Sequence, residues 1–100
     1  MFDMYCFMDK LGHDIVEVNG NWYIVDTCKT PDCGWETGIA QININAMREE
    51  WDGDELTAED IREWGEDFDM GWDVQNYRTK RQAEAGHKRV CKNGRLDEDE

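Results

Sequence analysis

The chain has 100 residues, of which 24 are acidic and 11 basic, and a formal net charge of -13. This length allows one domain, and no apolar run approaches the ~20 residues that a membrane-spanning helix needs. The first residues have neither the basic nor the apolar stretch of a signal peptide, which favours the cytoplasm. An aromatic content of 11% argues for a packed domain over residues 1–96, followed by a disordered acidic tail over 97–100.

Four segments have the composition of β-strands. The dipeptide Asn19-Gly20 separates two β-branched and aromatic runs, which predicts a β-hairpin over 14–27. Residues 35–44 predict another strand, with a bulge near Gly38, and the period-two alternation of 72–78 predicts a further one. The apolar residues 2–8 are an additional strand candidate.

Two segments have the pattern of amphipathic helices. Residues 57–68 begin at a candidate N-cap threonine and place an apolar stripe, which includes Trp64, opposite an acidic face. The capping-box pattern of Thr79 to Gln82 begins a helix over 80–93 that ends at a glycine. Its expected inner side consists of Ala83, Gly86, His87 and Val90. We therefore predict an α+β fold, in which an antiparallel sheet of about four strands packs with two helices.

Charge is strongly segregated along the chain. Residues 49–73 contain twelve acidic side chains and one basic one, whereas residues 74–96 contain one acidic and seven basic side chains. Mutual repulsion destabilises such a dense acidic block, so simple solubility explains it poorly. We interpret it as a surface for a basic host protein, with these candidate partner-binding residues: Asp52, Asp54, Glu55, Glu59, Asp60, Glu63, Glu66, Asp67 and Asp69.

The second predicted helix is basic on its outer side. Its cations are Arg78, Lys80, Arg81, Lys88, Arg89 and Lys92. They have the charge to contact phosphates, but the negative field of the whole molecule disfavours direct nucleic-acid binding. The simpler interpretation is that this helix pairs with the acidic block, either within the chain or across a homodimer.

The cysteines and histidines suggest one possible cofactor, a structural zinc ion. Cys28 and Cys33 lie close in sequence, and His87 and Cys91 are one helical turn apart, so the four have the ligand types of a Cys3His site. The alternative is that the cysteines are buried free thiols. The acidic clusters lack the glycine and glutamate spacing of a calcium-binding EF-hand.

No motif of an enzyme is recognisable. P-loop, dinucleotide-binding and serine-hydrolase motifs are absent, and His13 and His87 are the only histidines that could activate a cysteine nucleophile. We therefore predict a protein that is not an enzyme and has no catalytic residues.

Two segments carry a resemblance to a known family. Residues 26–37, which contain Gly34-Trp35-Glu36-Thr37, and residues 77–87, which contain Tyr77, Thr79, Ala83 and Gly86-His87, resemble the paired signatures of a family of small uncharacterised bacteriophage proteins. The resemblance implies a phage origin and the cytoplasm of an infected cell, but no activity.

The prediction for function is therefore built on charge and on class analogy. We expect a small acidic phage-type accessory protein that binds and inhibits a basic host protein, such as a nucleic-acid-handling defence enzyme, as anti-CRISPR, anti-restriction and DNA-mimic proteins do. The alternative is a small structural or nucleic-acid-associated module, stapled by zinc, that uses the basic helix.

Overall fold

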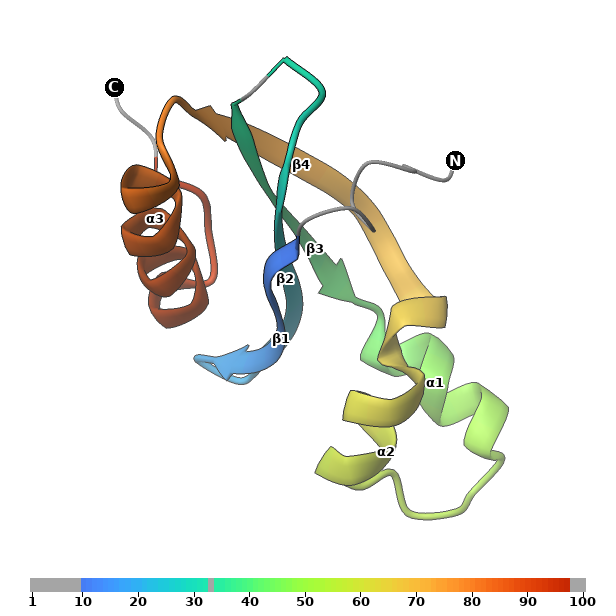
Figure 1. Cartoon of the computed structure of the whole chain (residues 1–100). Helices are drawn as coiled ribbons and strands as arrows, with labels where there is room; N and C mark the ends of the chain where they lie inside the picture. The colour runs from blue at the N-terminus through green and yellow to red at the C-terminus, as the bar shows by residue number, and fades with distance from the viewer. Residues whose placement is uncertain (1–9, 33, 98–100) are drawn as a thin grey trace.

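The computed structural model describes residues 10–32 and 34–97. Its elements in chain order are β1 (Lys10–Val18), β2 (Asn21–Lys29), β3 (Trp35–Ile42), α1 (Ile44–Trp51), α2 (Ala58–Trp64), the 3-10 helix η2 (Gly65–Phe68), β4 (Asp69–Tyr77) and α3 (Lys80–Asn93). The strands form an antiparallel sheet in the order β1-β2-β3-β4, as Figure 1 shows. The predicted α+β class is confirmed, with three α-helices in the described part of the chain.

The β1–β2 hairpin forms at the predicted dipeptide. Asn19 and Gly20 both have positive φ, 54° and 84°, as a two-residue hairpin turn requires. The strands extend beyond the predicted limits of 14–27, because they pair from Lys10 opposite Cys28 to Val18 opposite Asn21. This long ribbon gives the sheet its first two strands.

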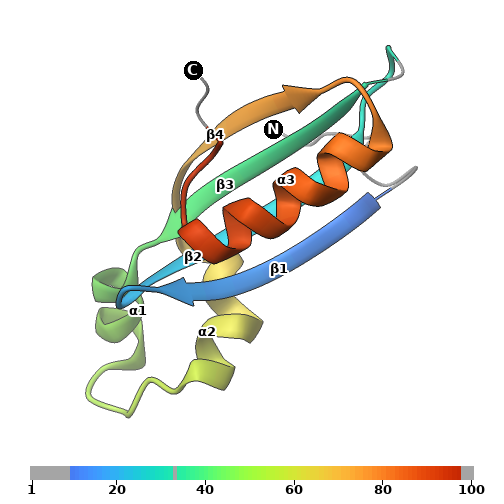
Figure 2. The ribbon, with the colours of Figure 1, turned by 90° about the vertical axis from the view of Figure 1, so that its left-hand side faces the viewer.

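The two faces of the sheet have separate cores. On one face, Val25 and Ile39 pack with Val90 of α3. On the other face, Trp22, Ile24 and Ile42 pack with Met47 of α1 and Ile61 of α2. Figure 2 shows α3 lying over the sheet with its axis along the strands, while α1 and α2 lie at one end of the sheet. The helices α1, α2 and η2 form the connection between β3 and β4, and we call them the lobe.

Helix α3 follows the sequence prediction closely. The Thr79 side chain accepts from the Gln82 backbone N–H while the Gln82 side chain accepts from the Thr79 backbone N–H, which is the predicted capping box. The helix ends at Gly94, with φ 72°. All four residues of the expected inner side are buried: Ala83, Gly86, His87 and Val90. The cap and the apolar stripe together therefore determine both the limits and the orientation of α3.

The lobe differs from the prediction in three ways. Residues 44–51 form α1, a helix that begins at the N-cap Asn43 and for which no element was predicted. The single helix predicted over 57–68 is instead α2 followed by η2. The predicted placement of Trp64 in the core is wrong, because its side chain is 48% exposed. The buried positions of α2 and η2 are Ile61 and Gly65, four residues apart, so the buried side is narrower than the predicted stripe and leaves Trp64 outside it.

Other predictions concern the bulge in β3, the two ends of the chain and the absence of a membrane span. The irregularity in β3 lies between Ala40 and Ile42 rather than near Gly38. The strand candidate over 2–8 lies outside the described residues, and so do residues 98–100. Asp97, which was assigned to the tail, accepts hydrogen bonds from the Tyr77 hydroxyl at 2.9 Å and the Arg89 guanidinium at 2.8 Å. Within the described residues, no helix is long and apolar enough to span a membrane.

Candidate functional site

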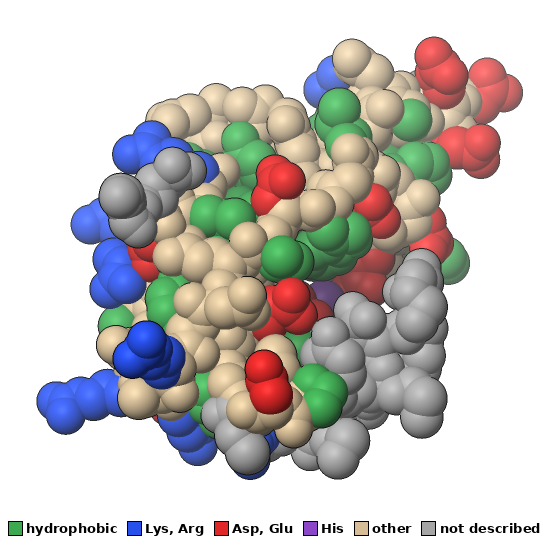
Figure 3. Space-filling model, turned by 90° about the horizontal axis from the view of Figure 1, so that it is seen from above, with side chains coloured by type: hydrophobic (Ala, Val, Ile, Leu, Met, Phe, Trp, Pro, Cys, Tyr) green, Lys and Arg blue, Asp and Glu red, His purple; other side chains and the backbone are tan. Residues whose placement is uncertain are grey.

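The predicted acidic surface lies on the lobe and on the start of β4. All nine candidate residues are in this region, with Asp52, Asp54 and Glu55 in the loop after α1, Glu59, Asp60 and Glu63 on α2, Glu66 and Asp67 on η2, and Asp69 at the start of β4. Every one is exposed except Asp60, which is half-buried. In Figure 3, acidic side chains gather toward one corner of the molecule.

Three of the twelve carboxylates in residues 49–73 have structural partners. Asp60 accepts from the Thr57 backbone N–H at 3.1 Å, and this hydrogen bond lowers its pKa. Glu66 pairs with His13, and Asp69 accepts from the Gly71 backbone N–H at 3.1 Å. The other nine form no side-chain hydrogen bond or ion pair within the described residues. They are Glu49, Glu50, Asp52, Asp54, Glu55, Glu59, Glu63, Asp67 and Asp73.

The position of some carboxylates opposes helix stability. Glu49 and Glu50 lie in the last turn of α1, where the helix dipole is negative and favours cations. The first turn of α1 has no acidic residue. Local helix energetics therefore do not explain why these side chains are acidic.

The basic helix does not neutralise this surface. Helix α3 packs against the face of the sheet opposite the α1–α2 core, and its main contacts are with strands β1, β2, β3 and β4. None of the twelve carboxylates forms an ion pair with a lysine or arginine within the described residues. The interpretation that the two blocks pair within the chain is therefore wrong, and Figure 3 shows blue side chains along the side away from the acidic corner.

Apolar side chains accompany the acidic surface. Trp64 of α2 is 48% exposed, and Trp72 and Val74 of β4 are 46% and 54% exposed. Trp72 and Val74 lie over Gly38, on the face of the sheet that also carries the α1–α2 core. Large exposed aromatic side chains beside charged groups are typical of protein-binding surfaces.

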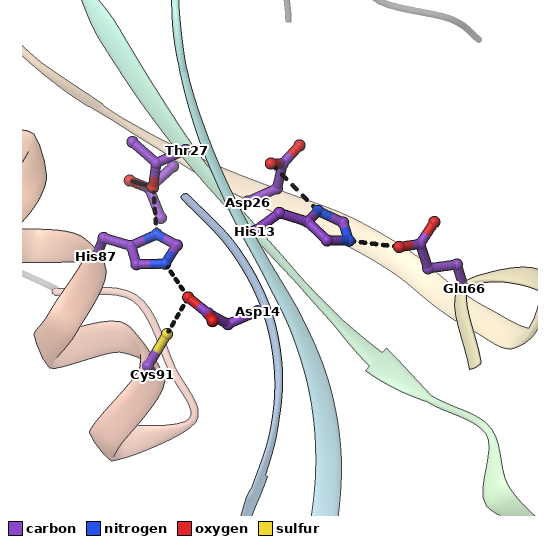
Figure 4. Close-up of polar contacts among 8 residues, drawn as sticks. His13, Asp14, Asp26, Thr27, Glu66, His87 and Cys91 are labelled. Carbon is purple, nitrogen blue, oxygen red and sulfur yellow. Dashed lines mark hydrogen bonds and ion pairs between the residues drawn. The ribbon is translucent and has the colours of Figure 1, made fainter. Parts of the chain in front are cut away.

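His13 connects the lobe to the sheet. Its Nδ1 lies 3.3 Å from Asp26 Oδ1 on β2, and its Nε2 contacts the Glu66 carboxylate of η2 (Figure 4). The hydrogen bond to Asp26 is the main cause that raises the pKa of His13 above its ordinary value of 6.5; burial opposes it and Glu66 adds to it. The protonated imidazolium therefore links two carboxylates that belong to different parts of the fold.

This linkage makes the stability depend on pH. Because the folded state raises the pKa of His13, its contribution is complete below the unfolded value of about 6.5 and is lost as pH rises through the folded value. We expect His13→Gln to lower the urea midpoint more at about pH 6 than at alkaline pH, because the stabilising contribution of the imidazolium is lost as pH rises through its folded-state pKa. An equal loss at the two pH values would contradict this role for the imidazolium.

A second histidine lies in a buried polar chain under α3. His87 Nε2 is 2.7 Å from Asp14 Oδ2 on β1, and His87 Nδ1 is 2.7 Å from Thr27 Oγ1 on β2. Thr27 Oγ1 is 2.6 Å from Thr37 Oγ1, and both threonines are fully buried. Cys91 Sγ lies 3.9 Å from Asp14 Oδ2 (Figure 4). Burial is the main cause that raises the pKa of Cys91 to about 11, so this side chain is a thiol at neutral pH.

The structure brings together only part of the predicted zinc set. His87 and Cys91 point the same way, as their spacing predicts, and both reach Asp14. Cys28, however, is disulfide-bonded and follows Thr27 on β2, so its side chain lies on the opposite face of the sheet from His87. Cys28 is therefore wrong as a ligand of a site shared with His87, and its disulfide also makes the alternative of a free thiol wrong at this position. Cys33 lies outside the described residues.

Sequence reasoning missed Asp14, Thr27 and Thr37 as partners of His87. The period-two alternation of β1 places Asp14 on the same face as Val16, which packs in the α3 core. That alternation does not reveal which face a distant helix covers.

The two segments of the phage resemblance meet here, because Thr27 contacts His87 and Trp35 lies opposite Tyr77 in the sheet. No family model, curated protein or solved structure matches the chain.

Proposed function

We propose that this protein binds a basic, nucleic-acid-handling host protein through its acidic surface and inhibits it by occupying the groove that nucleic acid would fill. The observation that carries the proposal is the set of nine exposed carboxylates of residues 49–73 that have no partner within the described residues. Eight of them are carried by the folded lobe and Asp73 by β4, so their spacing is defined before binding.

The surface also suits a protein partner better than a simple cation. Uncompensated carboxylates attract a basic surface from a distance and accelerate association at low salt. The exposed Trp64 and Trp72 add apolar area for contact after that encounter. The resemblance to phage proteins agrees with a role against host defence in the cytoplasm of an infected cell.

A charge-reversal experiment tests the proposal without damaging the lobe. Asp60 and Glu66 are unsuitable for reversal, because Asp60 caps α2 and Glu66 pairs with His13. Glu59 and Glu63 are exposed, lie one turn apart on α2 and have no partner among the described residues. The matched control reverses Glu17 of β1 and Glu84 of α3, which are also exposed and change the net charge equally.

The readout is capture of basic proteins from a bacterial lysate by the immobilised chain, over a series of salt concentrations. We expect the wild type and E17K/E84K to retain a nucleic-acid-binding protein that duplex DNA displaces, and E59K/E63K to bind it about tenfold more weakly. Equal capture by both variants, or capture that DNA does not displace, would contradict the proposal. Direct binding of DNA by the wild type at physiological salt would instead favour the module that uses α3.

A further inference from the structure

Three side chains of different chemistry converge where β1 meets α3. Asp14, His87 and Cys91 each offer one ligand atom, and these three atoms all lie within 4.8 Å of one another. They provide one oxygen, one nitrogen and one sulfur, a combination that suits zinc and related borderline-soft divalent ions. We propose that Asp14, His87 and Cys91 form a three-ligand metal site, with zinc as the preferred ion and a fourth position open to solvent.

The imidazole is oriented as a metal ligand requires. His87 is only 8% exposed, and its Nδ1 is fixed by Thr27 Oγ1 at 2.7 Å, so Nε2 faces Asp14. Metal-binding histidines usually hold their second nitrogen in such a hydrogen bond, which fixes the ring and its tautomer. Figure 4 shows this chain running from Thr27 through His87 to Asp14 and Cys91.

Gly12 leaves room for the ring in this orientation. A Cβ atom at this position would lie 2.8 Å from His87 Nε2, 3.0 Å from Cε1 and 3.2 Å from Cδ2. Nearly equal distances to these three atoms place that point over the ring face rather than along the Nε2 lone pair. The backbone of β1 therefore supports the imidazole and leaves the coordinating direction clear.

The buried threonines can adjust their protons to a bound metal. With a metal on Nε2, Nδ1 is protonated and donates a hydrogen bond to the Thr27 hydroxyl. The Thr27 hydroxyl in turn donates a hydrogen bond to Thr37. On the adjacent strand, Gln75 lies opposite Thr37 in the register. Its buried Oε1 has no hydrogen-bond partner in the described part of the chain and offers an acceptor near the Thr37 end of this series of hydrogen bonds.

The distances between the ligand atoms need only a modest change to hold a zinc ion. Bonds of ~2.0 to 2.3 Å to nitrogen, oxygen and sulfur in a tetrahedral site place ligand atoms ~3.3 to 3.7 Å apart. The present separations are 2.7 Å from Asp14 Oδ2 to His87 Nε2 and 3.9 Å from Asp14 Oδ2 to Cys91 Sγ. The Asp14 side chain is 55% exposed and is free to rotate by this amount. Its exposure also gives the ion a route from solvent.

Cobalt(II) is a suitable probe, because a thiolate ligand produces a charge-transfer absorption in the near ultraviolet. We expect the chelator-treated full chain to bind one cobalt per molecule with this absorption, and zinc to displace the cobalt and raise the Tm. Cys91→Ser should abolish the absorption. Asp14→Asn, which keeps the size of this exposed side chain, should weaken cobalt binding by more than about tenfold, and Thr27→Val by about tenfold.

His13→Gln is the matched control, because His13 also lies between two acidic side chains but has no sulfur ligand within reach in the described structure. We expect it to leave the cobalt absorption and the increase in Tm that zinc produces unchanged. Absence of the absorption in the wild type would overturn the proposal. An undiminished absorption in Cys91→Ser would also overturn it, since the metal would then be bound by other cysteines.

Discussion

Replacing Gly86 by alanine is expected to destabilise the protein, although alanine is the better helix former. An added Cβ would lie 2.3 Å from the Tyr77 hydroxyl oxygen and 2.4 Å from Cζ, so the ring of Tyr77 must move. The Tyr77 hydroxyl also donates a hydrogen bond to the Asp97 carboxylate at 2.9 Å. Overpacking of this kind costs about 1–3 kcal/mol and the hydrogen bond about 1 kcal/mol, against a gain in helix propensity of about 1 kcal/mol.

We therefore expect Gly86→Ala to lower the free energy of unfolding by about 2 kcal/mol and the Tm by roughly 10 °C. A double-mutant cycle identifies the cause, because in a Tyr77→Ala background the same substitution should be neutral or stabilising. Ala85→Gly, at the exposed neighbouring position, measures helix propensity alone. Burial is the main cause that raises the pKa of Tyr77 to about 12, so a displaced ring should also titrate at lower pH. Unchanged tyrosine titration in Gly86→Ala would contradict this explanation.

The features that could be predicted from the sequence are those that depend on local backbone physics. Asn19-Gly20 specifies a turn because both residues tolerate positive φ, and Thr79 with Gln82 begins α3 because their side chains satisfy free backbone N–H groups. Helix α1 had comparable signals that were missed. Asn43 accepts from the Ala46 backbone N–H, and Met47 points into the core one turn later.

The features that could not be predicted depend on how distant elements meet. The spacing of His87 and Cys91 placed both on one side of α3, but nothing local indicated that Asp14 lies beneath them. Cys28 was the plausible partner by chemistry, yet a one-residue step along β2 separates it from Thr27 and turns it to the other face. The same limit applies to charge, because segregation along the chain did not reveal that the sheet would separate the acidic and basic blocks.

Replacing Met47 by alanine is expected to have the largest effect on the lobe. Met47 is fully buried among Trp22, Ile24, Ile42 and Ile61, and it is the only buried residue of the eight-residue helix α1. Truncating a buried methionine costs about 2–5 kcal/mol, and so short a helix has little stability of its own. We expect the free energy of unfolding to fall by an amount in this range, measured by urea unfolding that is followed by tryptophan fluorescence. Met47→Leu, which conserves volume, should lower it by less than about 1.5 kcal/mol.

This substitution also separates two explanations of partner binding. Met47→Ala retains all twelve carboxylates of residues 49–73 and the net charge of -13, but it loosens the helices that carry most of the carboxylates. If a fixed array of charges is recognised, the variant should capture less of the basic partner than Met47→Leu does, and its α1 and α2 amides should exchange hydrogen faster than those of α3. Binding equal to that of Met47→Leu, together with this faster exchange, would mean that net charge alone attracts the partner.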